Sequence, residues 1–575
     1  MSTPETDTTK PSTTYITTPI YYVNDRPHIG HCYTTLVADV LARFHRLLGN
    51  DVFFLTGTDE HAEKVVTSAK AHDMTAQQWA DHNAARFREA FQFMQFSNDD
   101  FVRTSEDRHK LRASAYIQRL VDQGDIELGD YEGWWDASQE EYVPENTARE
   151  HDYKSPVTKK PLEKRVEQNY FFRLDKYEDW LRAMIEEKRI EVLPEQRKNE
   201  VLGRIKQGLQ KVPVSRKIKD GDEDWGIRMP NDPDHRVYVW IEALCNYLTV
   251  VDNAHPACDT SKAEGDRRTY WPKSGQGASN VVHFMAKDIL WFHAVIWPAM
   301  LHALSETPPT TVYAHAYWVA EGVKMSKSLG NFIELDDLKA YADRYSLDAV
   351  RWYLITQGPL GATDADFAYK RFVEVYNADL ANGIGNCASR VGNMIAKYFD
   401  GKIQDWQILE HFNIEVDGET VLRTPPRGRA VPLAQSISNL INENKIGDLL
   451  LSAKSAIRII DQFLSDTAPF KLAKDPSKLQ EVHSILYQAA ESIRIVSLAY
   501  FPTMPEKMAQ LWRNWNCTHL NDPNDIESGF VAPLMELAQW AGPYGLKPGQ
   551  QISKGDALFM RADVNAESPA ATKPD

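Results

Sequence analysis

The sequence predicts an α/β fold with a parallel sheet that is split by an insertion and followed by a bundle of helices. Short apolar runs such as those in TTYITTPIYYVN and DVFFLTGTDEH recur in the first part of the chain. Continuous apolar runs are typical of strands covered on both faces. Residues from about 123 to 235 are rich in charged and aromatic types instead, and residues from about 377 to 515 show apolar side chains at helical spacing.

The first strands and the helix between them follow from periodicity. TTYITTPIYYVN is β-branched and aromatic, as a buried strand should be. The apolar residues after it recur at intervals of three and four and predict a helix: Leu36, Val40, Leu41, Phe44 and Leu48. The run VFFL then predicts the second strand.

Two later segments, NVVHFMAKD (280–288) and TTVYAHAYWV (310–319), have the form of these strands. Asp59 and Asp288 each stand just past the apolar part of a strand. Ligands of open α/β sheets bind beyond the carboxyl ends of the strands. The pattern therefore predicts a nucleotide-type crevice at that edge of the sheet.

The remaining segments predict an insertion, a helical domain and two loose ends. Aromatic and acidic stretches such as YEGWWDASQEEYVPE indicate that 123–235 interrupts the α/β domain. Ile384, Ala388, Val391 and Ile395 share one helix face, and IGDLLLSAKSAIRIIDQFL repeats the pattern, which predicts a helix bundle. The polar ends, 1–13 and 564–575, are expected to be a disordered leader and tail.

Composition excludes several classes of protein. A chain of 575 residues is too long to fold around one hydrophobic core, so about two to four domains are expected. No apolar run reaches the roughly 18 residues of a membrane span, and the start lacks the apolar core of a signal peptide. The five cysteines form no C-x-x-C pair, so we expect no structural zinc, no disulfide framework and a reducing, cytoplasmic location. A net charge of −16 argues against indiscriminate binding of nucleic acid.

Two short motifs carry the chemistry. PHIGH (27–31) follows a predicted strand and opens a helix, where backbone N–H groups and two histidines could face an anion. Gly30 would let a phosphate approach the backbone. VKMSKSLGN (323–331) offers Lys324 and Lys327, whose ammonium groups suit phosphates. Taken alone, PHIGH is equally compatible with a pair of surface histidines. The lysine motif could be a solvated basic loop, but it arises by chance far less often.

Together the motifs resemble the signatures of the class I aminoacyl-tRNA synthetases in order, spacing and context. The surrounding blocks TTPIYYVNDRPHIGH, FLTGTDEH, YVWIEALCNY, KDILWFHAVIWPAML and TAPFKLAKD resemble the methionyl-tRNA synthetases within that class. The resemblance covers roughly residues 14 to 563. It implies that an amino-acid carboxylate attacks the α-phosphate of ATP and displaces pyrophosphate, a reaction catalysed mainly by positioning and charge stabilisation.

The resemblance implies a role for particular residues. The catalytic residues would be His28, His31, Lys324 and Lys327. ATP would be bound by His28, Gly30, His31, Lys287, Asp288 and Lys327, and Mg²⁺ would arrive with ATP without dedicated protein ligands. The methionine pocket would consist of Ile20, Tyr22, Asp59, Trp240, Leu244, Tyr247 and His293. Asp59 would pair with the substrate ammonium, and aromatic walls suit a polarizable thioether.

It also implies a tRNA partner and a domain order. The partner would be tRNA(Met), including the initiator, and its anticodon would meet Asn386, Arg390 and Phe470. The domains would be a Rossmann-like catalytic domain (14–122 and 236–322), a connective insertion without a zinc knuckle (123–235), a KMSKS loop and stem-contact region (323–376) and an α-helical anticodon-binding domain (377–563). A monomer is the simplest expectation.

The chain departs from the family's pattern at four positions. Ala62 and Ala286 replace glycines of TDEHG and GKD, Glu242 replaces an aspartate and Phe470 a tryptophan. We expect these changes to adjust activity. Two alternatives stay open from the sequence: a related synthetase for leucine, valine or cysteine, and a synthetase-like protein that binds tRNA or nucleotide without catalysis.

Overall fold

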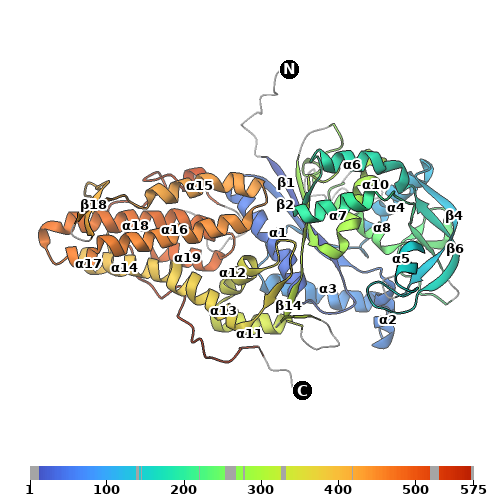
Figure 1. Cartoon of the computed structure of the whole chain (residues 1–575), viewed down its shortest axis with the longest axis horizontal. Coiled ribbons are helices and arrows are strands. Elements are labelled where there is room, and N and C mark those ends of the chain that lie inside the picture. The colour runs from blue at the N-terminus through green and yellow to red at the C-terminus, as the bar shows by residue number, and fades with distance from the viewer. Residues whose placement is uncertain are drawn as a thin grey trace.

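A computed structural model describes residues 12–137, 141–143, 145–218, 221–252, 267–275, 279–320, 322–325, 332–416, 419–517 and 530–570. A parallel sheet flanked by helices stands at the centre, with a β-rich unit at one end and a helix bundle at the other (Figure 1). This architecture confirms the predicted fold class. Within the described part of the chain, every helix is too short or too polar to span a bilayer.

The central sheet has six strands, and all of its neighbouring pairs are parallel. In spatial order the strands are β3 (Asp100–Arg103), β2 (Asp51–Asp59), β1 (Thr13–Tyr22), β12 (Asn280–Ala286), β13 (Thr311–His315) and β7 (Glu191–Leu193). The chain leaves β1 toward β2 on one side, while β12 lies on the other side. A ligand crevice is expected at such a switch point, outside the carboxyl ends of β1 and β12.

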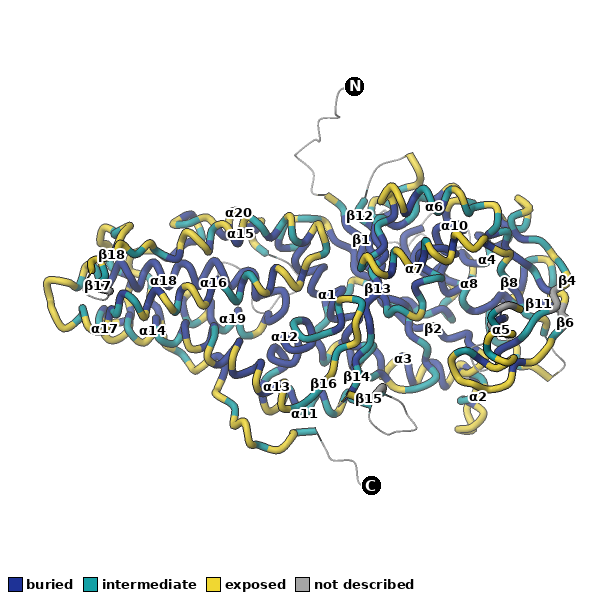
Figure 2. Tube along the Cα trace, in the orientation of Figure 1, coloured by how far each residue is buried: buried dark blue, intermediate teal, exposed yellow. Residues whose placement is uncertain are grey.

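Helices cover the two faces of this sheet. The helices of the sheet domain are α1 (Ile29–Leu47), α2 (Glu63–Ala71), α3 (Ala76–Phe93), α4 (Asp107–Asp122), α6 (Glu178–Glu186), α7 (Glu195–Ile205), α8 (Val239–Leu244), α9 (Asn246–Thr249) and α10 (Trp297–Ala303). A π-helical turn, Phe292–Ile296, precedes α10. α1 is buried along almost its whole length because it packs between the sheet and the helical domain (Figure 2).

The segment predicted as an insertion forms two small antiparallel sheets. One has the order β5 (Glu141–Val143), β4 (Ile126–Asp136), β6 (Glu163–Phe172) and β8 (Val212–Pro213), with α5 (Glu145–Glu150) beside it. The other has the order β10 (Arg228–Met229), β11 (Asp232–Val237) and β9 (Ser215–Lys217). β7 also lies within 123–235 but pairs with β13, so this segment both leaves the central sheet and contributes its sixth strand.

A connecting region joins the sheet domain to the bundle. The predicted strand 310–319 divides here, because β13 ends at His315 and β14 (Trp318–Ala320) joins a separate sheet with β15 (Val323–Lys324) and β16 (Ala365–Phe367). Tyr317 donates its backbone N–H to Asp364 at 2.9 Å at the point of division. The helices of this region are α11 (Leu335–Tyr345), α12 (Leu347–Gln357) and α13 (Tyr369–Val375).

The C-terminal part is a helix bundle, as predicted. A π-helical segment (Tyr376–Gly385) leads into α14 (Asn386–Phe399). The other elements are β17 (Phe412–Val416), β18 (Glu419–Arg423), α15 (Arg427–Asn442), α16 (Ile446–Thr467), α17 (Pro469–Leu472), α18 (Leu479–Tyr500), α19 (Pro505–Asn514) and α20 (Leu534–Leu537). α18 is buried from Val482 to Tyr500, which makes it the central helix of the bundle.

Candidate active site

The two histidines of PHIGH form the cap of α1. The backbone N–H of Gly30 donates to Nδ1 of His28, and the backbone N–H of His28 donates to Nδ1 of His31, both at 3.1 Å. Because Nδ1 of each ring accepts a hydrogen bond, each neutral ring carries its proton on Nε2. The site therefore combines two Nε2–H donors with the positive end of a helix dipole, a combination that suits an anion.

Gly30 is required by the packing of this cap. A Cβ atom at that position would lie 3.0 Å from Cε1 of His28. The two imidazole rings are also packed together, with centroids 3.9 Å apart. Any side chain at Gly30 would push the His28 ring away from its partner and disturb the orientation of both donors.

The chain that follows the lysine motif returns to this cap. The backbone N–H of Ile29 donates to the carbonyl of Ile333 at 3.0 Å, and the ring of Phe332 lies 4.9 Å from that of His28. At the start of the motif, Lys324 pairs through its backbone with Val319 of β14. The side chain of Lys324 and the whole of Lys327 lie outside the described residues, so their predicted roles stay predictions.

Lys287 and Asp288 follow the end of β12. Nζ of Lys287 lies 2.7 Å from Oδ1 of Asp364 and 4.6 Å from the ring centroid of Tyr317. Asp288 is exposed, and its carboxylate lies near the Tyr317 hydroxyl. Burial and the Asp288 carboxylate together raise the pKa of Tyr317. The two residues predicted to contact ATP, Lys287 and Asp288, therefore lie beside defined neighbours within the protein.

An aromatic wall lies beside the crevice. Trp240 of α8 stacks on Phe292 with centroids 4.3 Å apart and meets Tyr22 of β1 edge-on at 5.8 Å. Tyr22 is aligned with Asp59 in the parallel pairing of β1 and β2. Ile20, Tyr22, Trp240 and Phe292 are partly buried at the margin of a core cluster that also contains Leu244 and Tyr247. Residues from three segments of the chain thus share one apolar surface.

Behind this wall, Tyr247 and His293 form a buried hydrogen-bonded pair. Nδ1 of His293 lies 2.9 Å from the Ile289 carbonyl, so this nitrogen donates. Nε2 must then accept from the Tyr247 hydroxyl, which lies 2.7 Å away. Burial lowers the pKa of His293 to about 4, so the ring is neutral near pH 7.

Asp59 stands at the carboxyl end of β2 and is 3% exposed. Burial, followed by the nearby Tyr21 and Asp59, raises the pKa of the Tyr247 hydroxyl. The seven predicted methionine residues thus come together from β1, β2, α8, α9 and the π-helical turn. None of these contacts involves a ligand, so their substrate roles stay predictions.

Sequence reasoning missed two features of this region. Phe292 stacks on Trp240, and a signal for it was its position directly before His293. Glu242 lies between His61 and His109, at 2.9 and 2.8 Å respectively. His109 belongs to α4, 133 residues away in sequence from Glu242, and no motif marks it.

A cavity of about 300 Å³ lies between α2, the start of α8 and the insertion. His61 and Val239 line it on the sheet side, and Trp135, Arg165 and Arg216 line it on the insertion side. The guanidinium carbons of Arg165 and Arg216 lie 5.1 and 4.6 Å from the ring centroid of Trp135. Trp135 itself is buried. The guanidinium groups that line the cavity suit the phosphates of a single-stranded nucleic acid.

The predicted anticodon residues lie in the helix bundle, away from the sheet (Figure 1). Asn386 is exposed at the start of α14, and Arg390 one turn later forms an ion pair with Asp461 of α16. Phe470, on α17, is 47% exposed. An exposed aromatic ring of this size is available for stacking.

The alanine departures fit the backbone without strain. Ala62 (φ −66°, ψ 143°) and Ala286 (φ −80°, ψ 157°) are both extended, a conformation that any residue adopts. Among the described residues, no group of three or more histidine, cysteine or acidic side chains could hold a metal ion. Cys32, Cys245, Cys387 and Cys517 are buried free thiols, and Cys258 lies outside the described residues.

Comparisons with known proteins agree with this geometry. A family model described as tRNA synthetases class I (M) matches residues 14–151 and 147–392. The chain is 37% identical to a methionine–tRNA ligase of Halalkalibacterium halodurans, over 96% of this chain and 79% of that one. It is 36% identical to that of Streptomyces coelicolor, over 97% of each chain. Mycobacterium tuberculosis methionyl-tRNA synthetase in complex with methionyl-adenylate matches with a TM-score of 0.79 and 30% identity, over 95% of this chain and 99% of that one.

Proposed function

This chain belongs to the class I methionyl-tRNA synthetases, and we propose on that basis that it is a methionine–tRNA ligase. It activates L-methionine with ATP, releases pyrophosphate and transfers the methionyl group to the 3′ end of tRNA(Met), and so supports protein synthesis. The methionine-specific names of the relatives disfavour a synthetase for leucine, valine or cysteine.

One observation carries the proposal most directly. Ile333, two residues after the lysine motif, accepts the backbone N–H of Ile29, so the chain returns to the α1 cap directly after that motif although about three hundred residues separate the two in sequence. The return of the chain to this cap supports a single nucleotide crevice that both signatures serve. This arrangement also disfavours a protein that has kept the fold and lost the chemistry, because the donors of the cap stay oriented.

The activation step uses positioning rather than covalent catalysis by the protein. The methionine carboxylate oxygen forms a bond to the α-phosphorus as the bond from that phosphorus to the pyrophosphate oxygen breaks. His28 and His31 donate from Nε2 to phosphate oxygens as their charge changes, and Gly30 permits the close approach. Lys324 and Lys327 neutralise the departing pyrophosphate, and Mg²⁺ enters with ATP as part of the substrate.

Methionine is recognised by charge at one end and by aromatic surface at the other. The Asp59 carboxylate pairs with the substrate ammonium. Trp240 contacts the thioether side chain, with Ile20, Tyr22 and Leu244 completing the apolar surface. The neutral His293 beside Tyr247 adds polarity near the sulfur without a positive charge that would repel the ammonium.

The tRNA is held at two places. Asn386, Arg390 and Phe470 contact the anticodon, where unstacked bases can be hydrogen-bonded and stacked. The cavity lined by Trp135, Arg165 and Arg216, which also includes His61 just after β2, receives the acceptor end. We propose that initiator and elongator tRNA(Met) are both substrates, and that the protein acts as a cytoplasmic monomer.

The test is amino-acid-dependent exchange of pyrophosphate into ATP, with each amino acid offered in turn. Exchange with methionine, and charging of a tRNA(Met) transcript at the same enzyme concentration, are expected. Exchange with leucine, valine or cysteine in place of methionine would contradict the substrate assignment. Tight tRNA binding with no exchange for any amino acid would contradict the enzymatic assignment.

A further inference from the structure

A buried cluster of three ionisable side chains lies directly beneath the pocket residues. Oε1 of Glu242 lies 2.9 Å from Nδ1 of His61, and Oε2 lies 2.8 Å from Nε2 of His109. The side chains of Glu242, His61 and His109 are 1%, 4% and 0% exposed. A carboxylate removed from water to this degree needs donors on both oxygens, and the two rings supply them.

The hydrogen bonds around His109 define its role further. The Thr249 hydroxyl donates to the Asn246 carbonyl at 3.1 Å, so the Thr249 oxygen accepts from Nδ1 of His109, also at 3.1 Å. Hydrogen bonds at both nitrogens therefore hold the His109 ring in place. Burial alone would raise the pKa of Glu242, but His61 and His109 outweigh burial and lower the pKa of this carboxyl below its usual value.

The cluster connects segments that carry the amino-acid pocket. His61 follows Asp59 by two residues at the end of β2. Glu242 lies on α8 between Trp240 and Leu244. The Glu242 carboxylate thus spans the interface between the first half of the split domain, which supplies Asp59, and the second half, which supplies Trp240.

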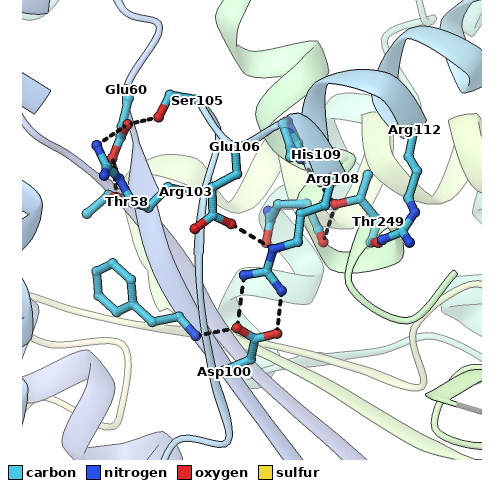
Figure 3. A network of polar contacts seen from close by, with 12 residues as sticks. Thr58, Glu60, Asp100, Arg103, Ser105, Glu106, Arg108, His109, Arg112 and Thr249 are labelled. Atoms are coloured by element: carbon cyan, nitrogen blue, oxygen red, sulfur yellow. Dashed lines mark hydrogen bonds and ion pairs between the residues drawn. The ribbon is translucent and has the colours of Figure 1, made fainter. Parts of the chain in front are cut away.

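Helix α4 anchors the far side of the cluster. Arg112 donates to the Thr249 carbonyl one turn after His109, and Tyr116 donates to Asp252 at 2.6 Å one turn later. His109 and Thr249 are seen in Figure 3 within a wider network that also contains Glu60 and its partners. One face of α4 therefore holds α9 in place and presents His109 to Glu242.

We propose that Glu242 is a positioning residue for methionine: by joining His61 to His109 it fixes the segment bearing Trp240 relative to the strand end bearing Asp59. This inference rests on the proposed function, since it names a determinant of the same pocket. Glu242 does not contact the substrate and acts through its two histidines. Its longer side chain, where the family's pattern has aspartate, reaches both rings.

The first test compares Glu242→Ala with Glu242→Gln. Alanine removes both contacts, and we expect the Kd for methionine by calorimetry and the KM for methionine in pyrophosphate exchange to rise about tenfold or more. The KM for ATP should change less than about twofold, because the α1 cap is not attached to this cluster. Glutamine can accept from one ring and donate to the other after a change of tautomer, so it should restore methionine affinity to within about threefold of wild type.

Two further variants separate positioning from a loss of stability. Glu491→Ala removes another fully buried carboxylate, paired with Arg494 inside the helix bundle, and should lower the melting temperature without changing either KM. His109→Ala removes the far contact while leaving Glu242 and His61 together, and should raise the methionine KM by about threefold or more. His109→Ala tests the proposal if the Glu242→Ala variant does not fold.

The outcomes distinguish this inference from the proposed function. A wild-type protein without methionine-dependent exchange would contradict the function itself. An active wild type whose Glu242→Ala and His109→Ala variants keep normal methionine affinity would overturn the positioning role alone. Equal increases in the KM values for methionine and ATP, or no rescue by glutamine, would also overturn it.

Discussion

Histidines of this molecule take distinct roles because their neighbours differ. His28 and His31 lie in a helix cap, where Nδ1 of each ring accepts a hydrogen bond from a backbone N–H, so each neutral ring carries its proton on Nε2. His293 is buried and neutral, with its proton on the side of the Ile289 carbonyl. The α1 cap thus has Nε2–H donors, which suit an anion, and the pocket has an uncharged imidazole whose Nε2 accepts a hydrogen bond. The role of each ring follows from which of its two nitrogens accepts a hydrogen bond and which one donates.

Removing the Tyr247 hydroxyl tests the pocket arrangement. In Tyr247→Phe, the buried Nε2 of His293 loses its donor, and an unsatisfied buried acceptor costs about 1–3 kcal/mol. We expect a methionine KM about tenfold higher in pyrophosphate exchange, with little change in the KM for ATP. A variant with wild-type methionine KM would show that the pair does not serve the substrate.

Tyr15→Phe is the matched control for that change. The Tyr15 hydroxyl donates to the backbone carbonyl of Tyr247 at 2.8 Å, so it is a buried tyrosine hydrogen bond in the same cluster. It does not contact His293. We expect Tyr15→Phe to lower stability by about 1 kcal/mol and to leave the methionine KM unchanged.

At the scale of elements, long apolar runs and helical periodicity were sufficient to predict β1, β2, β12 and two helices of the bundle, α14 and α16. Short elements were not predictable. β7 has three residues, too few to show a period, and its pairing with Thr311–Tyr313 connects segments more than a hundred residues apart. The division of 310–319 into β13 and β14 likewise depends on Asp364, a distant residue.

The candidate site shows the same limit. Residues in or next to recognisable motifs, such as His28 and Asp59, could be nominated from sequence because their spacing is local. The buried partners of His61 could not be nominated, because Glu242 and His109 meet only through the packing of α4 against α8 and α9. Phe292 enters the aromatic wall through a π-helical turn, which no periodicity rule anticipates.

The contact between α12 and α19 leads us to predict how the free energy of unfolding depends on pH. Asp348 of α12 accepts the Lys507 backbone N–H at 2.6 Å and is fully buried. Burial raises the pKa of Asp348 to about 7, whereas an unfolded aspartate ionises near pH 4. The native state therefore binds the Asp348 proton more tightly than the unfolded state does. The contribution of Asp348 to the free energy of unfolding consequently falls as the pH rises from about 4 to about 7.

Asp348→Asn should remove this dependence. Denaturant unfolding at several pH values is expected to show a flatter profile between pH 4 and 7, and a gain on the order of 1 kcal/mol or more at pH 8. Asp39→Asn is the opposite control, because Arg43 and Arg351 outweigh burial and lower the pKa of Asp39 to about 2. It should destabilise the protein at pH 8. An Asp348→Asn variant less stable than wild type at pH 8 would contradict the assignment.

At the scale of the whole molecule, the sheet domain and the bundle share one apolar core. A continuous cluster of buried side chains extends from α1 through α12 to α16 and α18. Arg351 is fully buried at this junction and donates to Asp39 of α1 at 2.6 Å, to Met94 at 2.8 Å and to Thr503 at 2.9 Å. Such a shared core fixes the distance between the crevice and the distal end of the bundle (Figure 2).

A fixed distance makes the two half-reactions separable by mutation. Activation needs only the crevice, whereas charging also needs tRNA docked on the bundle. Arg390→Ala should therefore lower kcat/KM for aminoacylation of tRNA(Met) by about tenfold or more, through the lost contact with an anticodon base, while methionine-dependent exchange stays within about twofold of wild type.

Asp461→Asn is the matched control: it removes the carboxylate that holds Arg390, so any cost of breaking the ion pair is shared, but the guanidinium remains available to RNA. Charging by Asp461→Asn should equal or exceed that of wild type. Loss of exchange in Arg390→Ala would show that the bundle serves the crevice directly, and equal losses of charging in both variants would show that the ion pair, rather than a contact with the anticodon, is what matters.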